Sequence, residues 1–387
     1  MKAIIAGGGT GGHLFPAIAL AEELRSRTTD LPLLFVGVEG GVEASLLARR
    51  GWDFEGIRAS GLQGKRFLSR LRSLTLIPSG LIRSLSILRR FRPDVVVGFG
   101  GYASAAVVLS AVLARVPTVI HEQNALPGLA NRWLGKIVDR VAVTFEGASE
   151  FFPKNKVRVT GNPVRTELFG VSRVEAVTRL DLDPNRLTVL IFGGSQGAHR
   201  LNQSVMEALP LLADEREQIQ FIHATGPRDL AVVRQGYDVG GYRAAVEPFF
   251  QAMAVAYAAA DLCVCRAGAG TVVELCALGK PSVLVPFPFA ANDHQRYNAE
   301  AVVASGGARM VLDCELSGAA VAEIIRTCLR DREGLEVMAR RAKALAKPDA
   351  AIRLADLVTQ TARQAPGARS HLFKPDLRRE TESCNHV

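Results

Sequence analysis

Short apolar runs alternate with amphipathic stretches along the first 160 residues of the chain. The short runs predict strands, whereas apolar positions that recur every three to four residues predict helices. The predicted strands are 2–6, 33–37, 54–57, 95–98, 117–120, 138–143 and 157–160, and the predicted helices are 13–26, 41–50, 79–91, 102–114 and 127–135. Because short apolar strands separated by helices are typical of parallel sheets covered on both faces, this part is predicted to be a doubly wound α/β domain.

The alternation breaks around residues 161–170 and then begins again. A second series of strands is predicted at 187–192, 219–223, 243–246, 261–265, 282–286 and 308–312, with helices at 198–211, 228–235, 250–259, 270–278, 293–304, 318–330 and 331–345. We therefore expect an N-terminal domain over 1–163 and a C-terminal domain over 164–347. A last helix at 348–363 is expected to return to the first domain, and the polar tail at 364–387 to be disordered.

Length and composition agree with two globular domains. The chain has 387 residues, and a single core rarely grows past about 250–300 residues. With 48% hydrophobic and 22% charged residues, the composition excludes a disordered chain. We expect no signal peptide, because Met1 leads directly into a predicted core strand, and no bilayer-spanning segment, because no uninterrupted apolar run reaches about 18 residues.

The six cysteines all lie in the C-terminal half of the chain. Cys263 and Cys265 fall on one face of a predicted strand, and no two cysteines have the spacing of a metal-binding pair. Buried, reduced thiols are the expected state, and no metal site is predicted.

The net charge of +9 is concentrated in residues 65–92, which hold eight basic residues and no acidic one. Leucines at helical spacing predict a core helix with a basic outer face over 79–91, whereas Pro78 and the flanking glycines suggest a loop over 66–78. Basic residues beside exposed apolar ones suit an anionic membrane surface. Nucleic acid is the alternative, but Phe67 is the only aromatic residue between Lys65 and Leu88, so bases would lack stacking partners. We therefore expect a membrane contact formed by Arg66, Phe67, Leu68, Arg70, Arg72, Leu76 and Ile77.

A glycine loop, Gly7–His13, joins the first predicted strand to the first helix. Its spacing Gly7-x-Gly9-x-x-Gly12 fits the dinucleotide fingerprint, in which the backbone approaches a phosphate at a helix N-terminus. A plain tight turn is the simpler interpretation. His13 lies outside the fingerprint and places an imidazole at the mouth of the loop.

Two similar signals occur in the C-terminal half. The loop 193–197, GGSQG, follows a strand and suits phosphate, and the segment 265–274, CRAGAGTVVE, leaves a helix start free of large side chains. Glu274 has two interpretations, which need not exclude each other. Thr271-x-x-Glu274 fits a capping box, and the carboxylate could instead accept hydrogen bonds from two ribose hydroxyls.

Polar residues follow two further strands. Glu122 and Asn124 belong to the motif HEQN at 121–124, which suits either a site or an ordinary loop. In the loop at 286–299, sugar hydroxyls could be bound by Asp293, His294, Gln295 and Asn298. Asn292 or Asp293 could instead simply cap the helix that follows.

Taken in order, the motifs GGGTGGHLFPAIALAEEL, GFGGYAS, HEQN, GNPVR, GGSQGA, CRAGAGTVVE and DHQ…NA resemble those of the MurG family. The resemblance covers about residues 1–360. It implies two Rossmann-like domains that face a cleft, the fold called GT-B. It also implies transfer of N-acetylglucosamine from UDP-N-acetylglucosamine to the C4 hydroxyl of the lipid-linked muramyl-pentapeptide, lipid I, which gives lipid II with inversion. No metal or other cofactor is implied.

The resemblance also assigns residues. In the C-terminal domain, donor phosphate would face Arg165, Ser195, Ala269, Gly270 and Thr271, uracil would lie at Phe250, ribose at Glu274 and the sugar at Gln295. From the N-terminal domain, donor sugar and acceptor would be bordered by Thr10, Gly11, Gly12 and Asn124. The acceptor would be reached on the cytoplasmic face of the bacterial inner membrane, where the enzyme is peripheral. Other cell-wall enzymes are expected partners, and nucleic acid is not.

The residue chemistry fits such a reaction independently. An inverting transfer needs one base to deprotonate the acceptor hydroxyl, and His13, with an ordinary pKa near ~6.5, suits that role at neutral pH. Glu122 is the alternative base, and His13 could instead orient phosphate. Three other functions are alternatives: a UDP-N-acetylglucosamine 2-epimerase, a dinucleotide oxidoreductase that uses Glu39 for ribose, and a non-enzymatic membrane scaffold that senses UDP-sugar.

Overall fold

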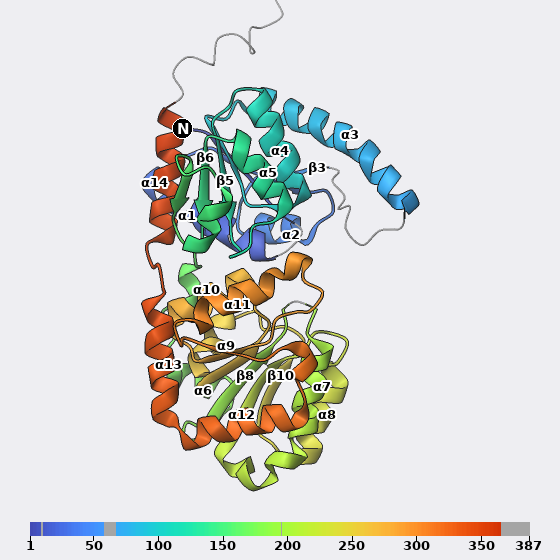
Figure 1. Cartoon of the computed structure of the whole chain (residues 1–387), viewed down its shortest axis with the longest axis vertical. Helices are drawn as coiled ribbons and strands as arrows, with labels where there is room; N and C mark the ends of the chain where they lie inside the picture. The colour runs from blue at the N-terminus through green and yellow to red at the C-terminus, as the bar shows by residue number, and fades with distance from the viewer. Residues whose placement is uncertain (9–10, 58–66, 195, 365–387) are drawn as a thin grey trace, which may run out of the picture.

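A computed structural model describes residues 1–8, 11–57, 67–194 and 196–364, with residues 42 and 67–78 described through their backbone alone. The first half forms a parallel sheet in the order β3-β2-β1-β4-β5-β6-β7 (Figure 1). Its strands are β1 Ala3–Ala6, β2 Leu33–Val38, β3 Phe54–Ile57, β4 Val95–Gly98, β5 Thr118–Glu122, β6 Arg140–Val143 and β7 Val157–Val159. Its helices are α1 Gly11–Arg27, α2 Val42–Arg49, α3 Phe67–Phe91, α4 Gly101–Leu113, α5 Leu129–Ile137 and the 3-10 helix η1 Glu146–Phe151.

The second half forms another parallel sheet, in the order β10-β9-β8-β11-β12-β13. Its strands are β8 Leu187–Phe192, β9 Ile219–Ala224, β10 Ala244–Glu247, β11 Leu262–Cys265, β12 Ser282–Leu284 and β13 Arg309–Met310. Its α-helices are α6 Arg173–Arg179, α7 His199–Ala208, α8 Leu230–Gly240, α9 Met253–Ala259, α10 Ala269–Leu278, α11 His294–Val303, α12 Gly318–Arg330 and α13 Arg332–Ala344. Its 3-10 helices are η2 Thr166–Leu168, η3 Pro210–Gln218, η4 Ala291–Asp293 and η5 Asp313–Glu315.

Buried apolar clusters cover both faces of each sheet, as the continuous apolar strands predict. The predicted fold class, two doubly wound α/β units, is confirmed. The last helix, α14 Ala350–Arg363, packs against α1 and against strands β4, β5 and β6 of the first sheet, and Figure 1 shows it beside that sheet. The domain bounds 1–163, 164–347 and 348–363 stay predictions, and residues 365–387 of the tail lie outside the described residues.

Two local expectations are wrong. Helix α3 begins at Phe67 and continues through Pro78, so residues 67–78 are not a loop. Proline removes one hydrogen bond from a helix interior, but leucine and arginine, which favour helices, recur along the helix both before and after it. The sequence prediction also missed α6, a short helix in which the Ser172 side chain accepts a hydrogen bond from the Glu175 backbone N–H.

The cysteines within the described residues are all free. Cys263, Cys265, Cys276 and Cys328 are buried, as expected, whereas Cys314 is exposed. Among the described residues, the structure contains no helix of sufficient length and apolarity to cross a membrane.

Candidate functional site

The candidate site lies where loops from neighbouring strands come together. In the first sheet β1, β4 and β5 are neighbours, and in the second sheet β8, β11 and β12 are neighbours. Their carboxyl ends carry the segments 7–13, 98–104, 121–124, 193–197, 265–274 and 286–293. Ligands of parallel sheets bind at this edge, so the chain's topology gathers the motifs that the sequence singled out.

His13 lies in the first turn of α1, which begins at Gly11. Its Nδ1 atom is 3.2 Å from Oε1 of Gln123, the residue that follows β5. The ring passes close to Gly100, where a Cβ atom would lie 2.9 Å from Cε1 of His13 and where φ is +97°. Only glycine fits there without strain. Burial lowers the pKa of His13, although the charge of Glu122 and the bond to Gln123 act in the opposite direction, so the neutral ring is favoured.

Glu122 is buried at the end of β5, and both of its carboxylate oxygens accept hydrogen bonds. One oxygen accepts from the backbone and side-chain N–H groups of Asn124, at 2.9 and 3.1 Å. The other accepts from Gly128 N at 3.2 Å and from Nδ2 of Asn131 at 2.9 Å. A carboxylate held in this way organises the loop, and it would have to leave these bonds to accept a proton from an acceptor. His13 is therefore the better candidate base.

Asn124 also joins the two halves of the chain. Its Oδ1 accepts a hydrogen bond at 3.2 Å from Nδ2 of Asn298 on α11, and Oδ1 of Asn298 accepts one at 2.8 Å from the backbone of Ala125. Asn298 is fully buried, and its Nδ2 group also donates to the Ala267 carbonyl. The sequence suggested Asn298 as a sugar ligand. The structure instead uses its whole amide for contacts within the protein.

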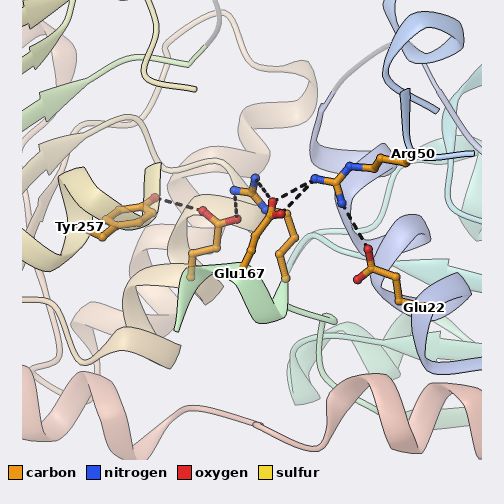
Figure 2. A network of polar contacts seen from close by, with 6 residues as sticks. Glu22, Arg50, Glu167 and Tyr257 are labelled. Carbon is orange, nitrogen blue, oxygen red and sulfur yellow. Dashed lines mark hydrogen bonds and ion pairs between the residues drawn. The ribbon is translucent and has the colours of Figure 1, made fainter. Parts of the chain in front are cut away.

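Glu274, on α10, lies at the centre of a polar network that Figure 2 draws in part. Its carboxylate accepts a hydrogen bond from Arg165 at 3.1 Å and one from the Tyr257 hydroxyl, also at 3.1 Å. Burial raises the pKa of Glu274, while Arg165 and Tyr257 oppose that rise. The guanidinium of Arg165 also lies 4.0 Å from the ring centroid of Phe15 on α1. Arg165 thus contacts both halves of the chain.

The network continues into the first half. Glu167, in η2, is 3.3 Å from Arg165 and 3.1 Å from Arg50, and Arg50 is 3.2 Å from Glu22 on α1. Figure 2 shows this path from Tyr257 past Glu167 and Arg50 to Glu22. The connecting segment that contains Arg165 and Glu167 is therefore held by ion pairs to both halves of the chain, to Glu274 in the second half and to Arg50 in the first.

The start of α10 is open. The N-cap residue is Gly268, and a Cβ atom built on Gly270 would contact nothing within 4 Å in the described part of the chain. The capping-box interpretation is wrong, because the helix begins at Ala269 and Thr271 is already inside it. Glu274 is then free to bind Arg165. Unpaired N–H groups at such a helix start, beside half-buried Thr271, suit a phosphate.

The remaining donor candidates differ in accessibility. Gln295 is half-buried at the start of α11, and its Oε1 accepts a hydrogen bond at 3.0 Å from the backbone N–H of Phe287. The Phe250 side chain is buried in the apolar cluster that contains Val255 and Tyr257, so any contact with a uracil ring would involve the backbone of Phe250. Asp293 occupies the N-cap position of α11, as the capping interpretation expected, but with a left-handed backbone and without a bond from its own side chain.

Several candidates lie outside the residues or side chains that the structure describes. Thr10, Ser195 and Arg66 lie outside the described residues, and Phe67, Leu68, Arg70, Arg72, Leu76 and Ile77 are described through the backbone of α3 alone. Gly11 and Gly12, at the start of α1, are exposed. Near Ser195, close packing requires glycine at two positions: a Cβ atom on Gly193 would lie 2.3 Å from Cβ of Ala198, and one on Gly197 would lie 2.0 Å from the Thr225 carbonyl oxygen.

Sequence reasoning missed three contributors to the site. Gln123 stands within the motif HEQN, so a signal was present, but its partner His13 is 110 positions away. Tyr257 and Arg50 carry no local signal, because their polar groups matter only through partners that the fold brings near.

Comparison with protein families gives two matches that together span both halves. Residues 3–143 match the glycosyltransferase family 28 N-terminal domain, and residues 188–354 match the glycosyltransferase family 28 C-terminal domain. The gap between the matched segments contains the stretch with Arg165 and Glu167.

Similar proteins include two named "UDP-N-acetylglucosamine--N-acetylmuramyl-(pentapeptide) pyrophosphoryl-undecaprenol N-acetylglucosamine transferase". The one from Myxococcus xanthus is 47% identical over 92% of this chain and 92% of its own length, and the one from Anaeromyxobacter sp. is 46% identical over 97% of each. A crystal structure of Acinetobacter baumannii MurG has a TM-score of 0.72 and 28% identity, covering 93% of this chain and 99% of that one. A UDP-N-acetylglucosamine 2-epimerase structure, at a TM-score of 0.66, 15% identity and coverage of 94% and 97%, shares the fold.

Proposed function

The chain belongs to glycosyltransferase family 28, and from this premise we propose that it transfers N-acetylglucosamine from UDP-N-acetylglucosamine to lipid I, which gives lipid II. Relatives at 42–47% identity carry names that describe this donor and this acceptor. They also confirm the resemblance to the MurG family. The new bond would join the sugar to the C4 hydroxyl of the muramyl residue.

One observation carries the proposal. Helix α1, which bears His13, packs against α10, which bears Glu274 and the open helix start, and Arg165 lies between Phe15 and Glu274. A candidate base from the first half and a candidate diphosphate site from the second half are therefore neighbours. A transferase needs this arrangement, because the acceptor and the donor must meet.

The donor would bind on the second half. Glu274 is a hydrogen-bond acceptor that suits two ribose hydroxyls, and the Arg165 guanidinium suits phosphate. Both groups are now bonded to each other, so donor binding would exchange that ion pair for contacts with ribose and diphosphate. Ala269, Gly270, Thr271 and the loop with Ser195 would complete the diphosphate site. The backbone at Phe250 would meet uracil, and Gln295 would meet the sugar.

The reaction would be a single displacement. The oxygen of the acceptor hydroxyl attacks C1 of the donor sugar, and the new C1–O bond forms as the bond from C1 to the diphosphate oxygen breaks. The hydroxyl proton passes to Nε2 of His13, and the bonding electrons leave with UDP. Dipoles at the start of α10 and the charge of Arg165 stabilise the departing diphosphate. One displacement inverts C1 and so gives the β linkage. Gly11, Gly12, Thr10 and Asn124 would border the acceptor.

The acceptor is anchored in a membrane, and we propose that the face formed by α3, α4 and α5 lies against it. These helices pack side by side, α3 on α4 and α4 on α5. Large apolar side chains are exposed along them: Ile82, Leu113, Leu129, Trp133 and Ile137. Arg89 on α3, and Arg132 and Lys136 on α5, are exposed on the same helices. Arg83 and Arg90 pair with Glu55, so part of the positive charge of α3 is balanced.

The predicted contact, Arg66 to Ile77, includes residues 67–77 of the same helix α3. Apolar side chains among cations suit an anionic phospholipid surface. The protein would then be a peripheral enzyme on the cytoplasmic face of the bacterial inner membrane, where it could also meet other cell-wall enzymes.

A sugar epimerase is the alternative, because a 2-epimerase shares the fold. A coupled assay separates the two. Protein would be mixed with UDP-[¹⁴C]N-acetylglucosamine and a lipid I analogue, with EDTA present. Label in the lipid fraction would support the transferase and its independence from metal. Label that stays in UDP-sugar, or that changes only to the epimer, would overturn the proposal.

A further inference from the structure

Gln123 is a buried amide beside the candidate base, and the proposed reaction has so far given it no role. Its side chain bonds to His13, to His121 and to the Phe99 carbonyl. A buried amide with this many partners is fixed in place, because each broken bond would leave a desolvated polar group.

The partners determine how the amide is oriented. Nε2 of Gln123 lies 3.0 Å from the Phe99 carbonyl oxygen and 3.2 Å from the His121 carbonyl oxygen. Carbonyl oxygens only accept hydrogen bonds, so the NH₂ group must face them. The amide oxygen is therefore the atom that faces Nδ1 of His13.

This orientation decides which nitrogen of His13 carries the proton. The Gln123 amide oxygen can only accept, so Nδ1 of His13 must donate. In the neutral ring the lone pair then lies on Nε2. A base must expose an unprotonated nitrogen to the acceptor hydroxyl, and the amide leaves Nε2 in that state.

His121 contacts the NH₂ group of the Gln123 amide. Its Nε2 lies 3.0 Å from the Gly161 carbonyl oxygen, so Nε2 carries the proton and Nδ1 is left to accept from Gln123, at 3.1 Å. Burial lowers the pKa of His121 to about 4, which keeps this ring neutral. This series of hydrogen bonds ends at the Gly161 carbonyl. At Gly161 φ is +82° and a Cβ atom would lie 2.9 Å from Cβ of Lys347, so the position requires glycine.

We propose that Gln123 and His121 are positioning residues that hold His13 in the tautomer with a lone pair on Nε2. The proposal deepens the proposed function, because it rests on His13 as the base. The charged and titratable groups that interact with His13 are Glu122 at the end of β5, His121 in β5, and His294 at the start of α11. His294 opposes protonation of His13 and Glu122 favours it, whereas His13 itself lowers the pKa of His121.

The direct test is the tautomer itself. Protein with ¹⁵N-labelled histidine rings would be examined by nitrogen–proton correlation spectra above the pKa of His13, with His13→Gln used to assign the signal. We expect Nδ1 to bear the proton and Nε2 to appear as the unprotonated nitrogen. In Gln123→Met, which keeps the length but offers no amide, the signal should change to a mixture of tautomers. A His13 ring protonated on Nε2 in the native protein, or an unchanged signal in Gln123→Met, would overturn the proposal.

Kinetics provide a second readout. Gln123→Met should lower kcat by about 10- to 100-fold, with the KM for UDP-N-acetylglucosamine nearly unchanged, because Gln123 is buried behind His13 and is not among the residues assigned to the donor. Gln123→Glu places a carboxylate beside Nδ1 of His13. The negative charge should raise the pKa of His13, and the acid limb of the kcat profile should therefore move to higher pH. Gln220→Met is the matched control, since Gln220 is a fully buried, hydrogen-bonded glutamine of the other half. It tests for loss of stability alone and should leave the His13 signal and the pH profile unmoved.

The outcomes separate this inference from the proposed function. A native protein that has the expected tautomer but transfers no sugar would contradict the function and leave the positioning role of Gln123 standing. An active protein with the other tautomer would contradict the positioning role alone. If the Gln123 variants fail to fold, the native spectrum still decides the tautomer.

Discussion

The Arg165 guanidinium donates to the Glu274 carboxylate at 3.1 Å, although the two residues are 109 positions apart in the sequence. Both side chains are mostly covered, with 11% of Arg165 and 14% of Glu274 exposed. Each is also a candidate for the donor: one for phosphate, the other for ribose. The pair therefore holds two charged groups of the site against each other, and a donor would have to compete with this ion pair for both.

Glu274→Gln is expected to weaken donor binding by about 10- to 100-fold, because hydrogen bonds to a charged group contribute about 1.5–3 kcal/mol. The KM for UDP-N-acetylglucosamine should rise more than kcat falls, and titration calorimetry with UDP should give the same loss. The control is Glu215→Gln. Glu215 also pairs with an arginine, Arg326, and its side chain is 19% exposed, but it lies on η3. An equal loss in the control, or none in Glu274→Gln, would contradict the assignment to ribose.

His13→Gln is expected to lower kcat by about 10²- to 10⁴-fold at saturating acceptor, which is the usual contribution of a general base. The affinity for UDP should stay the same, because the imidazole would act on the acceptor. Burial lowers the pKa of His13, so in the native enzyme kcat should fall with an acid limb below about pH 6.5. Near-normal turnover in His13→Gln would remove this residue from the mechanism and return Glu122 to consideration.

Much of the fold could be predicted from the sequence, because its signals are local. The strand at Val95–Gly98 is a short apolar run, and the loop after β1 combines glycines with a helix start, so both are evident within a few residues. The same local reasoning failed at Pro78, where a residue that usually ends helices lies inside one. Pro78 disfavours a helix there, whereas the leucines and arginines on both sides favour one, and the local sequence does not show which effect is larger.

The site could be predicted only in part, because its contacts are not local. The spacing Thr271-x-x-Glu274 allowed either a cap or a ligand, and the outcome depends on the helix starting at Ala269 and on Arg165 reaching it from another segment. Likewise, the motif HEQN marked a polar loop, but the role of Gln123 follows from its partner His13 in a different strand–helix unit. Such pairings are fixed by topology rather than by spacing.

His223 makes the stability of the second half depend on pH. It is fully buried between Tyr237 and Asn202, and burial lowers its pKa to about 3, against an ordinary value of 6.5. Below pH 6.5, His223 binds a proton in the unfolded chain but stays neutral in the folded protein. The free energy of unfolding should therefore fall as pH drops, by about 1.4 kcal/mol for each pH unit at this residue, down to the folded pKa.

Urea unfolding at a series of pH values measures this slope. His223→Gln should reduce it between pH 6.5 and 4. The comparison variant is His294→Gln, because that half-buried ring donates to the Ala291 carbonyl rather than to the network around His223, and it should alter the slope little. A slope that is the same in the native protein and in His223→Gln would show that other groups govern the acid response.

Charge reversal in α3 and just before it tests the membrane face. The triple variant Arg66→Glu, Arg70→Glu, Arg72→Glu should float poorly with phosphatidylglycerol vesicles, because each basic residue near an anionic surface contributes about 1 kcal/mol and three together about 100-fold or more in affinity. The matched control reverses Arg179, Arg216 and Arg340, which are exposed on the second half and change the net charge equally. Transfer to a short, water-soluble acceptor should be the same in both triple variants, since the active groups are untouched. Equal flotation of the two variants would mean that net charge, rather than this face, directs the protein to the membrane.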